Sequence, residues 1–237
     1  MASRNASFHE GGIAGALLAP LKLAFALMLT FLGILVAAWI VDWMFVFKVW
    51  PDGIDRLRSI LTADLARARD LAAWQGGVPG AVAGTANFLY GVVFRITGMH
   101  DMGMRFAEGA ALSIPDTIVR NTYLANIDAI EVAMIGTQLL GVRLAGLAML
   151  APILVLIYII AGADGLTQRA IRRASGGRES ASLYHRAKHL QVGLMAIALL
   201  VGLLWPASFD VRSIGLLLAT VLGVFTRLQW AYYKKHL

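Results

Sequence analysis

Long stretches without a charged residue restrict the fold of this chain more than any other feature. Three of them, of 19, 20 and 18 residues, cover 23–41, 144–163 and 192–209. A helix of that length rises about 1.5 Å per residue and reaches across the roughly 30 Å hydrocarbon core of a bilayer. A fourth stretch, 213–226, has only 14 residues, but Arg212 and Arg227 at its ends can extend their side chains to the membrane surface. The sequence therefore predicts an all-α polytopic membrane protein with four transmembrane helices.

The composition supports a bilayer rather than water as the main solvent. Of the 237 residues, 59% are hydrophobic and 15% are charged, whereas soluble domains carry about 25% charged residues. The chain has no cysteine, which excludes disulfides, thiolate metal sites and cysteine nucleophiles.

The distribution of Lys and Arg predicts the orientation in a bacterial inner membrane. The first 22 residues, the loop 164–190 and the tail after residue 226 together carry a charge of +8, whereas 42–143 carries −1. Because positive segments stay in the cytoplasm, we expect both termini and the loop 164–190 to be cytoplasmic. The organisation predicted in chain order is 1–22 cytoplasmic, 23–41 first span, 42–143 periplasmic and mostly helical, 144–163 second span, 164–190 basic cytoplasmic helical hairpin, 191–209 third span, 213–226 fourth span and 227–237 cytoplasmic tail.

The periplasmic region contains an amphipathic helix and one ambiguous segment. Apolar residues recur at helical spacing from Ile54 to Trp74, with Asp52 as its N-cap. The next uncharged segment, 78–94, contains several glycines, and a crossing there would place the basic loop outside. We expect no crossing, and a re-entrant, interfacial or buried segment remains open. Helical periodicity from Thr117 to Gly141 then predicts a helix that continues into the second span.

The sequence contains no recognisable catalytic motif. The patterns GxxxxGK[ST], HExxH and GxSxG are absent, and we expect no cofactor, no metal site and no enzymatic activity. A membrane enzyme that uses Glu179 and His185 is a weaker alternative. We also expect no charged residue deep in any span, which disfavours a transporter.

The basic hairpin is the most informative stretch. It carries a net charge of +4 and fits either an anchor for anionic membrane lipid or a docking surface for a cytosolic protein. The candidate lipid- or partner-binding residues are Arg169, Arg172, Arg173, Arg178, Glu179, Tyr184, His185 and Lys188. We do not expect direct contact with nucleic acid, because this charge is ordinary beside a membrane.

The pattern DGLxxRxxRRxxGGRESxxxYHxAK, which starts at Asp164 and ends at Lys188, resembles a family of membrane proteins encoded in integrating conjugative elements. These proteins are usually encoded beside the TraD-type coupling ATPase and are similar to TraJ proteins of conjugative plasmids. Arg186 is a departure from the family, in which we expect a second histidine or a similar residue at this position. The four-span layout also agrees, and the family has no established catalytic residues.

The resemblance implies a role in conjugative DNA transfer through a type IV secretion system. The function that we expect is a non-enzymatic accessory subunit that binds the TraD-type coupling protein. A small transporter or pore formed by a homo-oligomer is the alternative, and flux through reconstituted liposomes would favour it.

Overall fold

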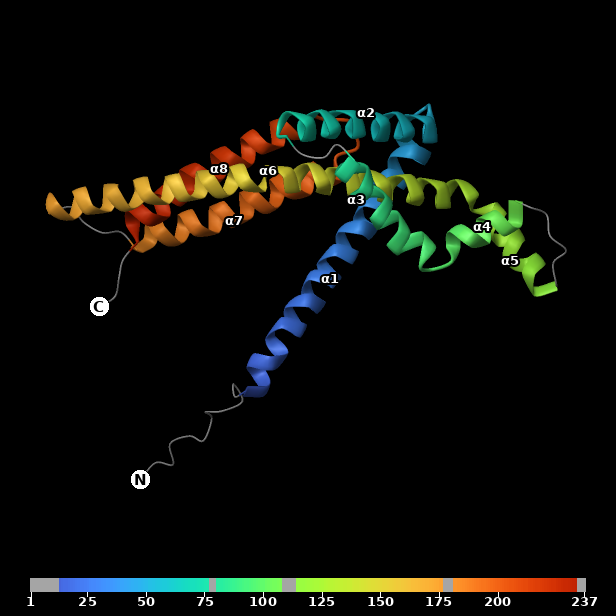
Figure 1. Ribbon diagram of the computed structural model, residues 1–237, viewed down its shortest axis with the longest axis horizontal. Helices are drawn as coiled ribbons and strands as arrows, with labels where there is room; N and C mark the ends of the chain where they lie inside the picture. Colours follow the sequence, from blue (N-terminus) through green and yellow to red (C-terminus); the bar gives the residue numbers. More distant parts are fainter. Residues whose placement is uncertain (1–12, 77–79, 108–113, 177–180, 234–237) are drawn as a thin grey trace, which may run out of the picture.

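The computed structural model describes residues 13–76, 80–107, 114–176 and 181–233, and these residues form helices and turns without a β-strand (Figure 1). The helices are α1 (Ile13–Met44), α2 (Gly53–Trp74), α3 (Gly80–Tyr90), α4 (Met99–Ala107), α5 (Ile114–Ala125), α6 (Ile127–Ala174), α7 (Ala181–Leu204) and α8 (Val211–Tyr232), with π-helical turns η1 (Phe45–Val49) and η2 (Gly91–Arg95). Four segments are long and apolar enough to cross a membrane, namely α1 with η1, α6, α7 and α8. The predicted all-α fold with four membrane-spanning helices is confirmed.

Helix α6 is the axis on which the other elements pack. It has 48 residues, and at about 1.5 Å per residue it is more than twice as long as the bilayer core is thick. Helices α7 and α8 lie along its C-terminal part, while α2 and α3 pack against its N-terminal part (Figure 1). The predicted second span, 144–163, is therefore the middle of a much longer helix.

Helix α1 leaves this bundle at a steep angle (Figure 1). Every residue from 21 to 30 is exposed, whereas Leu35 and Ala38 further along are buried. Leu35 packs with Leu140 of α6 and Leu203 of α7. The C-terminal third of α1 is thus its attachment to the bundle.

Helix α2 forms as its apolar spacing predicts. Leu57, Ala68 and Ala72 are buried against α6 and α3, in two clusters that also contain Ile135 and Val142. The predicted capping is wrong in detail, because Asp52 occupies the N-cap position but its side chain makes no capping hydrogen bond.

The described part of the ambiguous segment, 80–94, has one buried face. Val82, Ala86 and Leu89 of α3 are buried, and Val82 and Ala86 pack with α2 and α6. Helix α3 is not among the segments that could cross a membrane. The number of candidate membrane spans among the described residues therefore stays at four.

Two predicted helices differ from the structure in their extent. The helix expected to run from Thr117 into the second span is interrupted at Asn126, whose φ of −115° ends α5 and whose side-chain amide donates to the carbonyl of Thr122. The predicted third span reached residue 209, but α7 ends at Leu204. A non-helical connection follows, because Pro206 cannot continue the hydrogen-bond ladder.

The contact between α3 and α6 depends on a glycine. A Cβ on Gly141 would lie 2.7 Å from the Cα of Ala86, whereas a Cβ on Gly84 would meet nothing within 4 Å. We expect Gly141→Ala to lower the free energy of unfolding by about 1–3 kcal/mol, the usual cost of overpacking. Gly84→Ala makes the same change on an exposed helical face and should raise it by up to about 1 kcal/mol. Thermal unfolding in detergent measures both, and equal effects would contradict the close approach.

Candidate functional site

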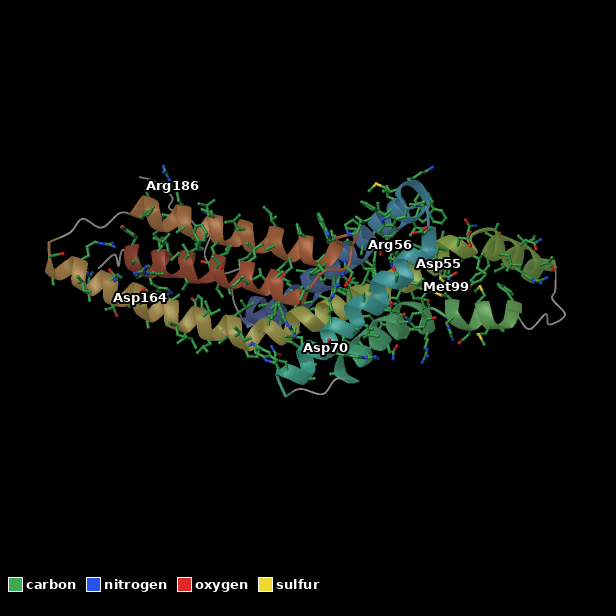
Figure 2. All side chains as sticks on the ribbon, turned by 90° about the horizontal axis from the view of Figure 1, so that it is seen from above. Asp55, Arg56, Asp70, Met99, Asp164 and Arg186 are labelled. Carbon is green, nitrogen blue, oxygen red and sulfur yellow. The ribbon has the colours of Figure 1, made fainter. Side chains whose placement is uncertain are left out.

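The residues predicted to bind a partner or lipid lie at one end of the α6–α7–α8 bundle. We call this the basic end and define it as Arg169, Arg172 and Arg173 on α6 with Tyr184, His185, Arg186 and Lys188 on α7. Figure 2 shows Asp164 and Arg186 at this end, far from Asp55 and Arg56 at the N-terminus of α2. Arg178 and Glu179, which were also predicted, lie outside the described residues.

One face of α6 in the basic end is occupied by contacts with α8. The carboxylate of Asp164 forms an ion pair with Arg227. A Cβ on Gly165 would lie 2.6 Å from the carbonyl oxygen of Arg227, so the two backbones approach closely. Arg172 Nη1 donates to the carbonyl oxygen of Ala231 at 2.9 Å, which satisfies an acceptor at the C-terminus of α8.

Aromatic side chains from the end of α8 complete this contact. The guanidinium of Arg172 lies 3.8 Å from the centre of the Tyr232 ring, and that of Arg169 lies 5.4 Å from the Tyr233 ring. The Tyr184 ring lies 5.6 Å from the same Tyr233 ring. Cations over aromatic faces are attracted by the ring quadrupole. Two of the predicted arginines and the predicted tyrosine thus hold the three helices together.

The remaining side chains of the basic end face outward. Arg173, His185, Arg186 and Lys188 are exposed, whereas Arg169, Arg172 and Tyr184 are half-buried. Arg186 points away from the bundle in Figure 2. The structure therefore divides the predicted site into an internal set and an exposed set. A sequence signal for this division is helical spacing. One face of α6 carries Asp164, Gly165, Arg169 and Arg172, and this is the face that belongs to the internal set.

A buried ionic cluster at the other end of the bundle was not predicted. Arg143 and Asp64 are both buried, and Arg143 Nε donates to Asp64 Oδ2 at 3.0 Å. The Arg143 guanidinium also donates to three carbonyl oxygens at the C-terminus of α7 and in the connection that follows, those of Leu203 at 3.0 Å, Trp205 at 2.7 Å and Ala207 at 3.0 Å. The predicted organisation places Arg143 at the last position of the periplasmic region 42–143, next to the second span.

Ser208 and Arg67 complete what we call the Arg143 cluster. Ser208 Oγ donates to Asp64 Oδ1 at 2.6 Å and accepts a hydrogen bond from Arg67. The Phe209 ring centre lies 5.2 Å from the Arg143 guanidinium carbon. This cluster joins α2, α6 and the α7–α8 connection. Burying a guanidinium whose donors lack partners would cost free energy, and the hydrogen bonds of the cluster supply those partners to Arg143.

A further buried carboxylate lies beside the predicted first span. Asp42 directly follows 23–41, falls within the longer candidate span 19–49 and is 6% exposed. Its carboxylate occupies the space that a side chain at Gly136 would need. Beside it, Trp39 Nε1 donates to Thr137 Oγ1 at 3.0 Å. The helix of the first span continues past residue 41, and this is why a residue placed outside the span lies inside it.

The exposed set consists of Arg173 on α6 and of His185, Arg186 and Lys188 on α7. Three of these four side chains are cations, so the set concentrates positive charge at this end of the bundle. In the described part of the chain, no group of three or more His, Cys, Asp or Glu side chains is placed to hold a metal ion.

Comparison with protein families finds a match over most of the chain. Residues 51–234 match the family described as "DtrJ-like: IncC plasmid conjugative DNA transfer protein DtrJ-like". The matched range begins after α1 and includes α2 to α8, and hence both the basic end and the Arg143 cluster. No curated protein and no solved structure matches the chain.

Proposed function

Since the chain belongs to the DtrJ-like family of conjugative DNA transfer proteins, we propose that it is a non-enzymatic accessory subunit of the inner-membrane transfer apparatus. In this role the basic end faces the cytoplasm and binds an acidic surface of the coupling ATPase of a type IV secretion system. The role requires a docking surface and no catalytic site.

The main support for the proposal is the group of exposed polar side chains on α7. A docking surface must keep its shape, and the internal contacts of Arg169, Arg172 and Tyr184 with α8 fix the helix that presents these side chains. Arg186, Lys188 and two histidines, His185 and His189, are exposed on neighbouring turns. Complementary charge steers association and suppresses wrong partners.

The orientation in the membrane is part of the proposal and rests on the charge distribution. The segment 164–190, which includes the end of α6 and the start of α7, carries six basic residues, and positive segments of this kind remain on the cytoplasmic side. Four crossings then place both chain ends on the same side as this segment. The Arg143 cluster would lie at the opposite, periplasmic side.

Labelling of single cysteines tests this orientation. The chain has no native cysteine, so Ser59→Cys and Ser182→Cys each introduce one reactive thiol at an exposed position outside the predicted spans. In intact spheroplasts an impermeant maleimide should modify residue 59 but not residue 182. Ser208 is avoided because it hydrogen-bonds Asp64. Modification of residue 182 from outside would contradict the proposed function.

Co-isolation from solubilised donor membranes tests the partnership itself. We expect the coupling ATPase to be retained with the tagged wild-type chain and lost after charge reversal at Arg186 and Lys188. Retention by the reversed variant would show that the exposed set is not the docking surface.

A further inference from the structure

A groove between three helices lies away from both polar sites. It has a volume of about 600 Å³ and is formed by the C-terminal end of α2, the middle of α6 and the first half of α8. The base of the groove is where α8 approaches α6, since a Cβ on Gly215 would lie 2.8 Å from Leu150 Cδ1. No residue of the basic end or of the Arg143 cluster lines the groove, so it belongs to neither.

Polar side chains occur at one end of the groove only. Trp74, Gln75 and Arg212 line that end, and Trp74 is 74% exposed. The remainder is lined by aliphatic side chains of α6 and α8, among them Ile153, Ile157 and Leu216, which are otherwise exposed or half-exposed. A groove with this division fits an amphiphile whose head group is polar and whose tail is apolar.

The proposed topology places the polar end at the level of a membrane surface. Ile153 and Ile157 are within the uncharged stretch 144–163, whereas Arg212 is at the start of α8 beside the non-helical connection 205–210. Trp and Arg at such a level are the side chains that proteins place among lipid head groups. The apolar part of the groove therefore opens into hydrocarbon, where an acyl chain is the available occupant.

Arg212 determines the charge of the expected head group. Among the ion pairs of the described residues, none involves Arg212. A guanidinium presents a planar fork of donors that matches a phosphate in two-point contact, and the Gln75 amide at the same end of the groove can supply another donor.

We propose that the groove between α2, α6 and α8 is a binding site for one anionic glycerophospholipid, with its phosphate at Arg212 and Gln75 and one acyl chain along Ile153, Ile157 and Leu216. The lipid would fill the space between the end of α2 and the bundle, and so would fix α2 against α6 and α8. This site is separate from the basic end and does not depend on the proposed partner.

The experiment uses the full-length chain, purified in a neutral detergent and freed of native lipid. Phosphatidylglycerol, phosphatidylcholine with the same acyl chains, and inorganic phosphate are each added in a concentration series, and the rise in the thermal unfolding temperature gives an apparent affinity. We expect phosphatidylglycerol to stabilise the chain more than phosphatidylcholine, and inorganic phosphate to have no effect.

Two variants separate the head-group contact from the tail contact. Arg212→Gln should weaken phosphatidylglycerol about fivefold, the effect of one basic residue at an anionic surface, and leave phosphatidylcholine unchanged. Ala219→Phe, which fills the apolar end, should weaken both lipids. If Ala219→Phe does not fold, Leu216→Ala removes one wall without adding bulk and should act in the same direction.

Arg105→Gln is the matched control, since Arg105 is an exposed arginine on α4, outside the groove. An equal loss of phosphatidylglycerol affinity in Arg105→Gln and Arg212→Gln would overturn the site. So would stabilisation by inorganic phosphate alone, which would indicate a free-anion site, or unchanged lipid affinity in both groove variants.

Discussion

Replacing Arg143 by methionine is expected to lower the free energy of unfolding by about 3–5 kcal/mol, the range measured when one partner of a buried ion pair is removed. The loss exceeds that expected for Gly141→Ala because charge and hydrogen bonds disappear together. Asp64 would remain buried without its main partner, and three carbonyl oxygens around the end of α7 would lose their donor. Thermal or denaturant unfolding in detergent is the measurement.

The side chains around Arg143 define the controls for this prediction. Arg67 lies 3.8 Å from Asp64 but is half exposed, so it can replace only part of the lost interaction. The double variant Arg143→Met with Asp64→Leu removes both charges and should recover a large part of the stability, because an apolar pair of similar volume avoids the desolvation cost. If the double variant is no more stable than Arg143→Met alone, the ion pair is not the origin of the loss.

The number and order of the membrane helices could be predicted because they depend on local properties. A run of uncharged residues needs the bilayer wherever it lies in the chain, and the apolar face of α2 follows from its own spacing. These predictions needed no knowledge of which residues meet in space. The fold class was confirmed for this reason.

The Arg143 cluster could not be predicted, because it depends on contacts between distant parts of the chain. Asp64 precedes Arg143 by 79 residues, and Ala207 follows it by 64. Nothing in the sequence around Asp64 or around Arg143 distinguishes these two residues from charged residues on a protein surface. A one-dimensional charge count therefore places both residues in the periplasmic region 42–143 without pairing them.

The predicted site was identified as a region but not resolved into its two sets. Basic residues near a membrane were interpreted as a surface, although Arg172 and Asp164 lie on the face of α6 that meets α8. The decisive partners are at the end of α8, about 60 residues later, where Ala231 supplies the acceptor and Tyr232 the aromatic ring. Much of the pattern that resembles the conjugative family thus serves helix packing.

This division changes which substitution tests the docking surface. Charge reversal at Arg172 would remove a hydrogen bond to Ala231 and a contact with Tyr232, so a loss of transfer could result from unfolding of the basic end. Arg186 and Lys188 are exposed on α7 and make no such contact with α8 among the described interactions. They are the cleaner pair to reverse.

We expect Arg186→Glu with Lys188→Glu to weaken binding of the coupling ATPase about a hundredfold and to lower conjugative transfer in parallel. Each reversal replaces an attraction to the partner's acidic surface by a repulsion, and about 1.4 kcal/mol for each corresponds to a factor of ten. The effect should decrease as the ionic strength rises, because exposed charges are screened. Mating frequency and co-isolation of the ATPase are measured in the same strains.

Two comparisons separate docking from membrane insertion. Arg56→Glu with Arg69→Glu makes the same change in net charge on exposed residues of α2 and should leave transfer unchanged. Arg186→Gln with Lys188→Gln keeps the loop 164–190 positive and should give an intermediate loss, whereas the reversed pair brings the loop to neutrality and could alter orientation. Labelling at Ser182→Cys in the reversed background resolves this point. Transfer at the wild-type frequency in a correctly oriented reversed chain would exclude the exposed set as the contact with the ATPase.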